Sequence, residues 1–192
     1  MLTHLRPALV SMGLFTVLLG LAYPLAITGV AQAAFPAQAN GSLVHDAKGA
    51  VVGSALIGQA FTKAQYLHPR PSAAGTGYDA SVSSGSNMGP LNDALAKRIK
   101  TDADALHAEN PGAVIPADAV TTSGSGLDPD ISPANARFQA PRIAKARQVP
   151  VGEVQAVIDA QTKAPLLGFI GQPTVNVLAV NRALDARFPK DG

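Results

Sequence analysis

The chain begins with a long apolar segment that carries no charge. No Lys, Arg, Asp or Glu lies between Arg6 and Asp46, and the uncharged apolar stretch runs from Ala8 to Ala31. A helix of that length spans roughly 36 Å at about 1.5 Å per residue, whereas the hydrocarbon layer of a membrane is about 30 Å thick. The pattern therefore predicts a transmembrane anchor helix within residues 1–34.

Small residues and a proline shape the expected surface of this helix. Gly13, Gly20 and Gly29 leave flat places where another membrane helix can approach closely, so we expect packing there. Pro24 is expected to kink the helix, because it has no backbone N–H to donate. Arg6 is the basic residue at the N-terminal end, and basic residues stay in the cytoplasm. The N-terminus is therefore expected inside and the bulk of the chain outside.

The same segment could instead be a signal peptide that is removed. Ala31-Gln32-Ala33 has the form of a cleavage site, with small residues on either side of the central one. Signal peptides have apolar cores of about 7–15 residues, and this core is far longer. The length favours an uncleaved anchor, and a mature protein that starts near Ala34 would show the opposite.

Residues 35–192 combine short strand patterns with helical ones. Residues 43–45 and 50–57 are predicted to pair as a hairpin, because a Gly-containing turn separates them. Ser132 and Thr174 are placed to cap two of the later helices. Helices are expected from Pro90 to about 108, from Pro133 to about 147 with an interruption at Pro141, over 151–158 and over 177–188, and a short strand over 166–170. The predicted fold is mixed α+β: one transmembrane helix followed by a single mixed α/β domain.

Composition removes several classes of function. The chain has no Cys, which excludes disulfides, thiolate catalysis and Cys-ligated metals. Aromatic residues make up 5%, Trp is absent and the net charge is +2, so a nucleic-acid partner is not expected. The four histidines show no i, i+4 pair, and we predict neither a metal site nor a catalytic residue.

A Gly- and Ser-rich loop lies directly before the helix expected at Pro90. It belongs to a long irregular stretch over residues 68–90, and such loops are usually functional or disordered. Residues 83–89 (SSGSNMG) could cradle an anion with backbone N–H groups at the helix N-terminus. The segment lacks the Gly-Lys-Ser/Thr of a P-loop, and a simple capped turn is the favoured interpretation.

A second such loop covers residues 123–130 (SGSGLDPD). Asp128 and Asp130, together with serine hydroxyls, could hold a hard cation or act as acid and base. The favoured interpretation is an Asx turn in which Asp130 or Ser132 caps the following helix.

A basic stretch follows this loop. Arg137, Arg142, Lys145 and Arg147 occur with no acidic residue between Ile131 and Pro150. These side chains could grip a phosphate or an acidic partner. We favour a solvated helix face whose charges meet acidic residues elsewhere in the fold.

A series of short segments, in order along nearly the whole chain, resembles the C subunit family of the bacterial potassium-transporting P-type ATPase, the Kdp complex. Each segment alone is weak evidence, and their order makes the resemblance specific. The segments are Arg6-Pro7-Ala8, residues 38–42 (QANGS), 53–59 (GSALIGQ), 70–73 (RPSA), 85–87 (GSN), 125–128 (SGLD), 131–133 (ISP), 142–147 (RIAKAR), 171–173 (GQP) and 175–177 (VNV).

The resemblance implies a non-catalytic accessory subunit of an ATP-driven, high-affinity potassium uptake pump. Its implied partners are a catalytic P-type subunit, a channel-like potassium-binding subunit, a small single-helix subunit and membrane lipid. No firmly bound cofactor is implied, because ATP and potassium are handled by the complex. The implied location is the inner membrane, crossed once, with the folded domain in the periplasm.

The resemblance leaves two mechanisms open. In one, the subunit is a catalytic chaperone that raises the ATP affinity of the P-type subunit, and Gln139, with Arg137 and Arg142 beside it, touches nucleotide. In the other, the domain supports assembly and caps the outer mouth of the channel-like subunit. The residues implied for this second role are Ser125, Asp128 and Asp130. The carboxylates of the two aspartates would supply a weak negative field there.

Two other classes remain as alternatives to a pump subunit. The chain could be a free-standing, membrane-anchored envelope protein that binds a small ligand through its Gly/Ser loops. An enzyme ranks third, because no nucleophile elbow follows a convincing strand. Purification in mild detergent separates these alternatives, since a pump subunit co-purifies with other chains.

Overall fold

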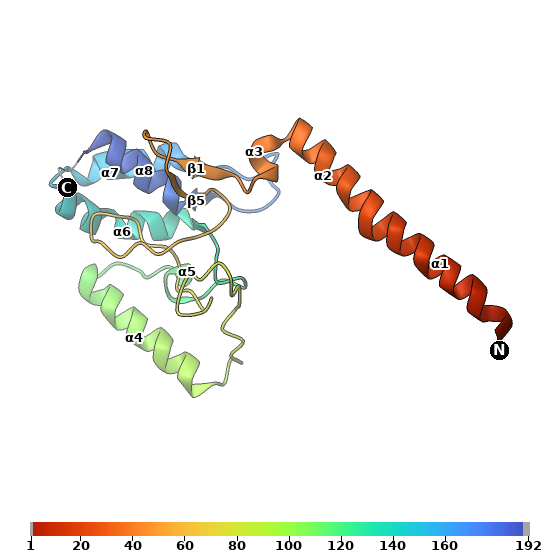
Figure 1. Ribbon diagram of the computed structural model, residues 1–192. Helices are drawn as coiled ribbons and strands as arrows, with labels where there is room; N and C mark the ends of the chain where they lie inside the picture. The colour runs from red at the N-terminus through yellow and green to blue at the C-terminus, as the bar shows by residue number, and fades with distance from the viewer. Residues whose placement is uncertain (1, 190–192) are drawn as a thin grey trace. The chain divides into compact units, whose positions relative to one another are not determined.

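The computed structural model describes residues 2–189, which fall into two compact units, Met1–Ser54 and Ala55–Gly192 (Figure 1). In the first unit, η1 (Leu2–His4) leads into a long helix that comprises α1 (Leu5–Val17), η2 (Leu18–Ala22) and α2 (Tyr23–Ala34). The 30 residues of Leu5–Ala34 are long and apolar enough to cross a membrane, and none is packed inside the fold. The predicted N-terminal helix is thus present.

Pro24 widens this helix instead of ending it. Because Pro24 has no N–H, the carbonyl of Gly20 lacks its regular partner four residues later. The turn η2 just before Pro24 is a π-turn, in which the N–H of Tyr23 donates to the Leu18 carbonyl five residues earlier. A π-turn of this kind lets the helix continue beyond a residue that breaks its hydrogen-bond pattern.

A hairpin completes the first unit. After the short helix α3 (Pro36–Ala39), β1 (Leu43–His45) pairs antiparallel with β2 (Val51–Ser54), with a bulge between Val44 and His45. The Asp46 carboxylate accepts the N–H groups of Lys48 and Ala50 and so closes the turn. The predicted hairpin is confirmed, with a second strand shorter than expected.

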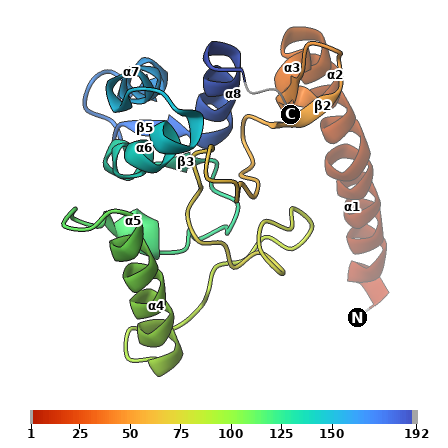
Figure 2. The same ribbon diagram turned by 90° about the vertical axis from the view of Figure 1, so that its left-hand side faces the viewer.

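The second unit is built around three helices and a small sheet (Figure 2). The sheet has the antiparallel order β3-β5-β4, formed by β3 (Asp130–Ile131), β5 (Thr174–Asn176) and β4 (Thr162–Lys163). Against it pack α6 (Pro133–Arg147), α7 (Val151–Gln161) and α8 (Val177–Arg187). The hydrophobic core comprises Leu67, Ile131, Ala136, Ala140, Ile143, Ala144, Val154, Val157, Ile158, Val175, Val177, Val180 and Leu184. The predicted class, a transmembrane helix followed by a mixed α/β region, is confirmed.

Two predicted elements near the C-terminus are wrong. Thr174 was expected to cap the last helix, but it lies in β5, and Asn176 is the cap, accepting the N–H of Ala179. Residues 166–170 were expected to form a strand, but they form a turn closed by one antiparallel bridge between Leu166 and Ile170. Strands of two or three residues are too short to show an alternating pattern, which explains the errors.

Helix α6 follows its prediction closely. The Ser132 hydroxyl caps it by accepting the N–H of Asn135, as predicted. The predicted interruption at Pro141 is wrong, because the helix runs from Pro133 to Arg147 without a break. Its last turn ends at Gln148, which takes the left-handed conformation.

Helices α4 (Asp93–Glu109) and α5 (Ala117–Val120) lie apart from α7 and α8 in both views (Figures 1 and 2). Helix α4 starts three residues after Pro90, so Pro90 is not its first residue as predicted. Asn92 provides the start, because its side chain accepts the N–H groups of Ala94 and Leu95.

Candidate functional site

Two buried side-chain amides hold the segment between β2 and α4 against helices α6 and α8. This segment, residues 55–92, is called here the irregular segment. Asn181 on α8 accepts the N–H of Leu67 at 2.7 Å and donates to the Leu67 carbonyl at 3.0 Å. Gln139 on α6 does the same for His68, at 2.8 and 3.0 Å. The two side chains therefore pair with the backbone as a neighbouring strand would, and they fix residues 67 and 68 in place without a sheet.

Gln139 has no hydrogen-bonding capacity left for a ligand. Besides its two bonds to His68, it donates to Asn135 Oδ1 at 2.9 Å and accepts from Arg142 Nη2 at 2.6 Å. An amide offers two N–H donors and one oxygen with two lone pairs, so all its groups are used. The residue is only 4% exposed. Contact with a nucleotide would require at least one of these bonds to break.

The arginines of α6 do not form the solvated face that we favoured. Arg137 is exposed and pairs with Asp159, as expected for that face. Arg142 is largely buried, where it pairs with Glu109 and donates to the carbonyls of Ala64 and Tyr66. The acidic partners lie elsewhere in the fold as expected, but no pattern in the sequence indicates that Arg142 is buried.

Arg147 is the most enclosed of these arginines, with a side chain that is 0% exposed. It donates to three backbone carbonyls, pairs with Asp185 at 2.7 Å, and places its guanidinium 5.3 Å from the centre of the Tyr66 ring. The three carbonyls belong to Gln65, Leu184 and Phe188. Arg147 thus joins α6, α8 and the irregular segment.

Burial and a neighbouring charge act on His68. Burial lowers the pKa of His68, and the Arg142 guanidinium, 3.3 Å from His68 Nε2, lowers it further. These two effects outweigh the contact of Nε2 with the Lys63 carbonyl, which raises the pKa, so the imidazole is mostly neutral at neutral pH.

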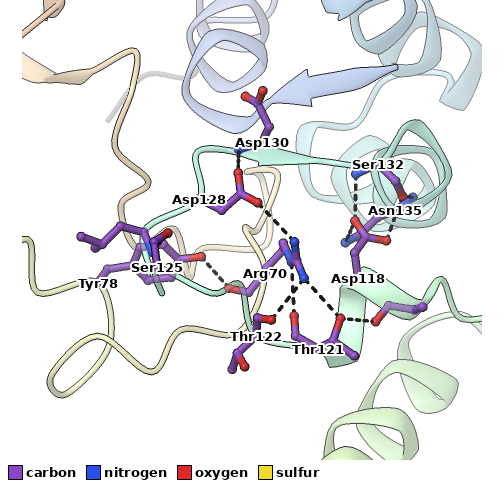
Figure 3. A network of polar contacts seen from close by, with 12 residues as sticks. Arg70, Tyr78, Asp118, Thr121, Thr122, Ser125, Asp128, Asp130, Ser132 and Asn135 are labelled. Atoms are coloured by element: carbon purple, nitrogen blue, oxygen red, sulfur yellow. Dashed lines mark hydrogen bonds and ion pairs between the residues drawn. The ribbon is translucent and has the colours of Figure 1, made fainter. Parts of the chain in front are cut away.

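Arg70 is the centre of a second network (Figure 3). It pairs with Asp128 at 3.2 Å and donates to the carbonyls of Thr121 and Thr122. Its own carbonyl accepts a hydrogen bond from the Tyr78 hydroxyl, and burial raises the pKa of Tyr78 above its usual value. The network ties three loop segments together around one guanidinium.

The loop over residues 123–130 forms the expected Asx turn. Asp128 Oδ1 accepts the N–H of Asp130 at 3.0 Å, and Asp130 accepts from the Asn176 side chain at 2.9 Å. Ser125 Oγ accepts the N–H of Leu127. The groups proposed from the sequence for ion attraction are thus each engaged in local contacts.

The two Gly/Ser loops, which the sequence treats separately, lie against each other. The N–H of Ser84 and the hydroxyl of Ser83 both donate to the Ser125 carbonyl, at 2.9 and 3.0 Å. Because Asn92 starts α4, the segment 83–89 does not open that helix, and its backbone is not arranged as a helix-terminal anion cradle.

Two cavities open on this unit. The first, of about 410 Å³, lies between α4, α6 and the irregular segment, and the second, of about 400 Å³, lies beside β3. Gln139, Arg142 and His68 line the first, and the carboxylates of Asp118, Asp128 and Asp130 line the second. Asp118 is committed to Ser132 and Asn135. Among residues 2–189, no group of three or more His, Cys, Asp or Glu side chains is placed to share a metal ion.

The glycines of the anchor helix leave open space on its surface. A side chain at Gly13 or Gly29 would meet nothing within 4 Å, and one at Gly20 would meet Thr16 Cγ2 at 4.0 Å. Packing against another membrane helix at these positions stays a prediction.

Comparison with known proteins decides the family. The sequence model of KdpC, described as the c chain of the K+-transporting ATPase, matches residues 5–186. The chain belongs to the KdpC family. The resemblance drawn from the ordered segments is thereby confirmed.

Relatives of the KdpC family match the chain over its full length. A protein of Caulobacter sp. (strain K31) is 82% identical over 192 residues, covering 100% of this chain and 98% of the relative. One of Caulobacter vibrioides (strain NA1000 / CB15N) is 78% identical, with 100% of both chains covered. One of Beijerinckia indica is 62% identical, covering 98% of this chain and 96% of the relative. Each is named potassium-transporting ATPase KdpC subunit, so this chain is the corresponding subunit of a K+-transporting ATPase complex.

Proposed function

We propose that the chain is a non-catalytic subunit that supports assembly and stability of the potassium pump. The helix Leu5–Ala34 anchors it in the inner membrane, the N-terminus faces the cytoplasm, and residues 35–192 lie in the periplasm. Arg6 supports this orientation, because it lies in the first turn of the helix and no other charged side chain precedes Asp46. The partners are the other pump subunits: the catalytic P-type subunit, the channel-like subunit and the small single-helix subunit.

The observation that carries the proposal is the internal use of the polar side chains. Gln139, Asn181 and Arg147 form their hydrogen bonds with backbone groups of the same chain. Such groups build a rigid body from a segment that has no regular structure, and a rigid body is what a docking subunit needs. They do not leave a convergent set of unsatisfied donors for a ligand.

A direct role in ATP binding receives less support. Gln139 is buried and fully bonded, and Arg142 beside it is paired with Glu109. The proposed periplasmic location also separates the domain from cytoplasmic ATP. An effect on the ATP affinity of the pump would therefore act through the assembled complex.

A role in potassium entry also receives limited support from the acidic residues. Asp128 lies 3.2 Å from the Arg70 guanidinium, which balances most of its charge. Asp130 forms no ion pair among the described residues and accepts a hydrogen bond from Asn176. Any negative field at the outer surface would come from Asp130 and Asp118 more than from Asp128.

The Gln139→Ala pump separates assembly from nucleotide contact. We expect less of the variant subunit to co-purify with the complex, because removal of the amide leaves the backbone N–H and carbonyl of His68 unpaired. The complex that does assemble is expected to keep its ATP affinity. Co-purification in mild detergent and the ATP dependence of hydrolysis measure the two effects.

The control is Arg137→Ala, which removes an exposed side chain from the same helix and leaves assembly unchanged. A Gln139→Ala complex that assembles fully but binds ATP several-fold more weakly would contradict the proposal in favour of the chaperone mechanism.

The orientation is tested with single cysteines, since the chain has none. We expect a Val114→Cys variant to react with a membrane-impermeant maleimide in intact spheroplasts, because Val114 is 90% exposed in the folded unit. A Thr3→Cys variant is expected to react only after lysis. Labelling in the reverse order would show that the folded unit faces the cytoplasm.

A further inference from the structure

An apolar turn lies between β4 and β5 with its side chains in solvent. It consists of residues 166–170 and is called here the apolar turn. Leu166 is 68% exposed, Leu167 and Phe169 are each 75% exposed, and Ile170 is 50% exposed. Scattered apolar residues on a surface are ordinary, whereas four within five consecutive positions form one patch that water solvates poorly.

The apolar turn satisfies most of its backbone N–H groups internally, whereas the carbonyls of Leu167, Gly168 and Phe169 accept no hydrogen bond from the described residues. Leu166 and Ile170 exchange N–H···O bonds of 3.0 and 2.9 Å, and the N–H of Gly168 donates to the Pro165 carbonyl at 2.9 Å. Leu167 and Gly168 both take positive φ angles, which keeps the turn tight. The hydrocarbon core supplies no hydrogen-bond partner, so the carbonyls of residues 167–169 must stay at the headgroup boundary, where water and polar groups can bond them. A protein interface instead carries about one hydrogen bond per 100–200 Å².

The charge pattern around the apolar turn also fits a membrane surface. No Asp, Glu, Lys or Arg occurs from residue 164 to residue 181, so the tip carries no charge to desolvate. Lys163, in β4 at the base of the turn, is exposed. A lysine in this position can extend its alkyl stem along the tip and place its ammonium among anionic headgroups.

The anchor keeps the folded unit close to the bilayer. About 20 residues separate Ala34 at the end of α2 from Ala55, and such a chain spans at most roughly 70 Å when fully extended. Tethering raises the local concentration of the apolar turn at the lipid surface, so a small apolar tip is sufficient for contact.

We propose that the apolar turn is a second membrane contact of this subunit, distinct from the anchor helix. Leu167 and Phe169 enter the boundary between headgroups and acyl chains, and Lys163 stays among the headgroups. Aromatic and aliphatic side chains at such a boundary bury apolar area while the rest of the unit remains in water. The contact adds a second point of attachment, which fixes the orientation of the folded unit on the membrane.

The test uses the full-length chain with one introduced cysteine at a time. Phe169→Cys carries an environment-sensitive fluorophore, and the chain is placed in nanodiscs of phosphatidylethanolamine and phosphatidylglycerol with or without brominated acyl chains. Two matched variants give the reference values for quenching. The label of Leu14→Cys, in α1, represents a lipid environment, and the label of Val114→Cys, at a site that is 90% exposed, represents water. We expect the Phe169→Cys label to lose most of its emission to brominated lipid and to resist aqueous iodide, whereas Val114→Cys does the opposite.

The outcomes distinguish whether the apolar turn contacts lipid, water or a partner subunit. Iodide quenching of Phe169→Cys equal to that of Val114→Cys, with Leu14→Cys still quenched by brominated lipid, would overturn the proposal while leaving the anchor intact. A Phe169→Cys label that brominated lipid does not reach, and that becomes shielded only in the assembled pump, would assign the turn to a partner subunit and also overturn it. Exchange of Lys163→Glu is expected to reduce the lipid quenching, because the carboxylate is repelled by anionic headgroups.

Discussion

Replacing Arg147 by methionine is expected to lower the free energy of unfolding by about 3–5 kcal/mol, the range for removing one partner of a buried charged network. Methionine fills much of the same volume but donates no hydrogen bond. The carbonyls of Gln65, Leu184 and Phe188 would then be left without their donor. Two of these carbonyls belong to the last turn of α8 and its cap, where a positive charge is also favoured by the helix dipole.

The measurement is urea unfolding of the complete chain in detergent, followed by circular dichroism. Arg137→Met is the matched control, because Arg137 lies on the same helix and its pair with Asp159 is 54% exposed on both sides. An exposed pair of this kind contributes about 0–1 kcal/mol. Equal effects of the two substitutions would show that the contacts of Arg147 do not stabilise the fold.

The sequence predicts the parts of the fold that carry long periodic patterns. The apolar anchor, the hairpin around residues 46–49, and the helices that begin at Pro133 and at Val151 are all found where the pattern places them. Each of these has either many repeats of one spacing or a clear boundary signal, such as a capping serine followed by proline.

The central sheet could not be predicted, because its strands are short and far apart in sequence. Residues 130–131 pair with 175–176, and residues 162–163 pair with 174–175. No local pattern distinguishes such pairs from loop. The same limit explains the wrong expectation that Thr174 caps the last helix.

With one exception, the buried polar contacts could not be predicted from the sequence either. Arg142 and Arg147 look like Arg137 in the sequence, and only tertiary packing separates them. Asn181 carried a readable signal, because it follows Val177 by four residues and precedes Leu184 by three, on the apolar face of its helix. An amide on such a face indicates a partner in the core, here the backbone of Leu67.

The Gly126→Ala substitution is expected to destabilise the fold by about 2–4 kcal/mol, through backbone strain and overpacking together. Gly126 has φ of +68°, and a Cβ there would lie 2.5 Å from the Ser84 carbonyl oxygen and 2.7 Å from the Ala74 nitrogen. Backbone atoms cannot move aside as a flexible side chain would. The two Gly/Ser loops must therefore separate, which breaks the bonds of Ser83 and Ser84 to the Ser125 carbonyl.

Two companion variants separate the causes of this loss. Gly124→Ala is the control, because a Cβ at that position meets nothing within 4 Å and its stability is expected to be unchanged to within about 1 kcal/mol. Gly126→Asn tolerates the left-handed conformation but still carries a Cβ. If close approach dominates, Asn and Ala lower the urea midpoint equally and both expose residues 72–86 to protease. If strain dominates, Asn recovers most of the stability, and the loops stay in contact. Wild-type stability in Gly126→Ala would show that these loops do not pack as described.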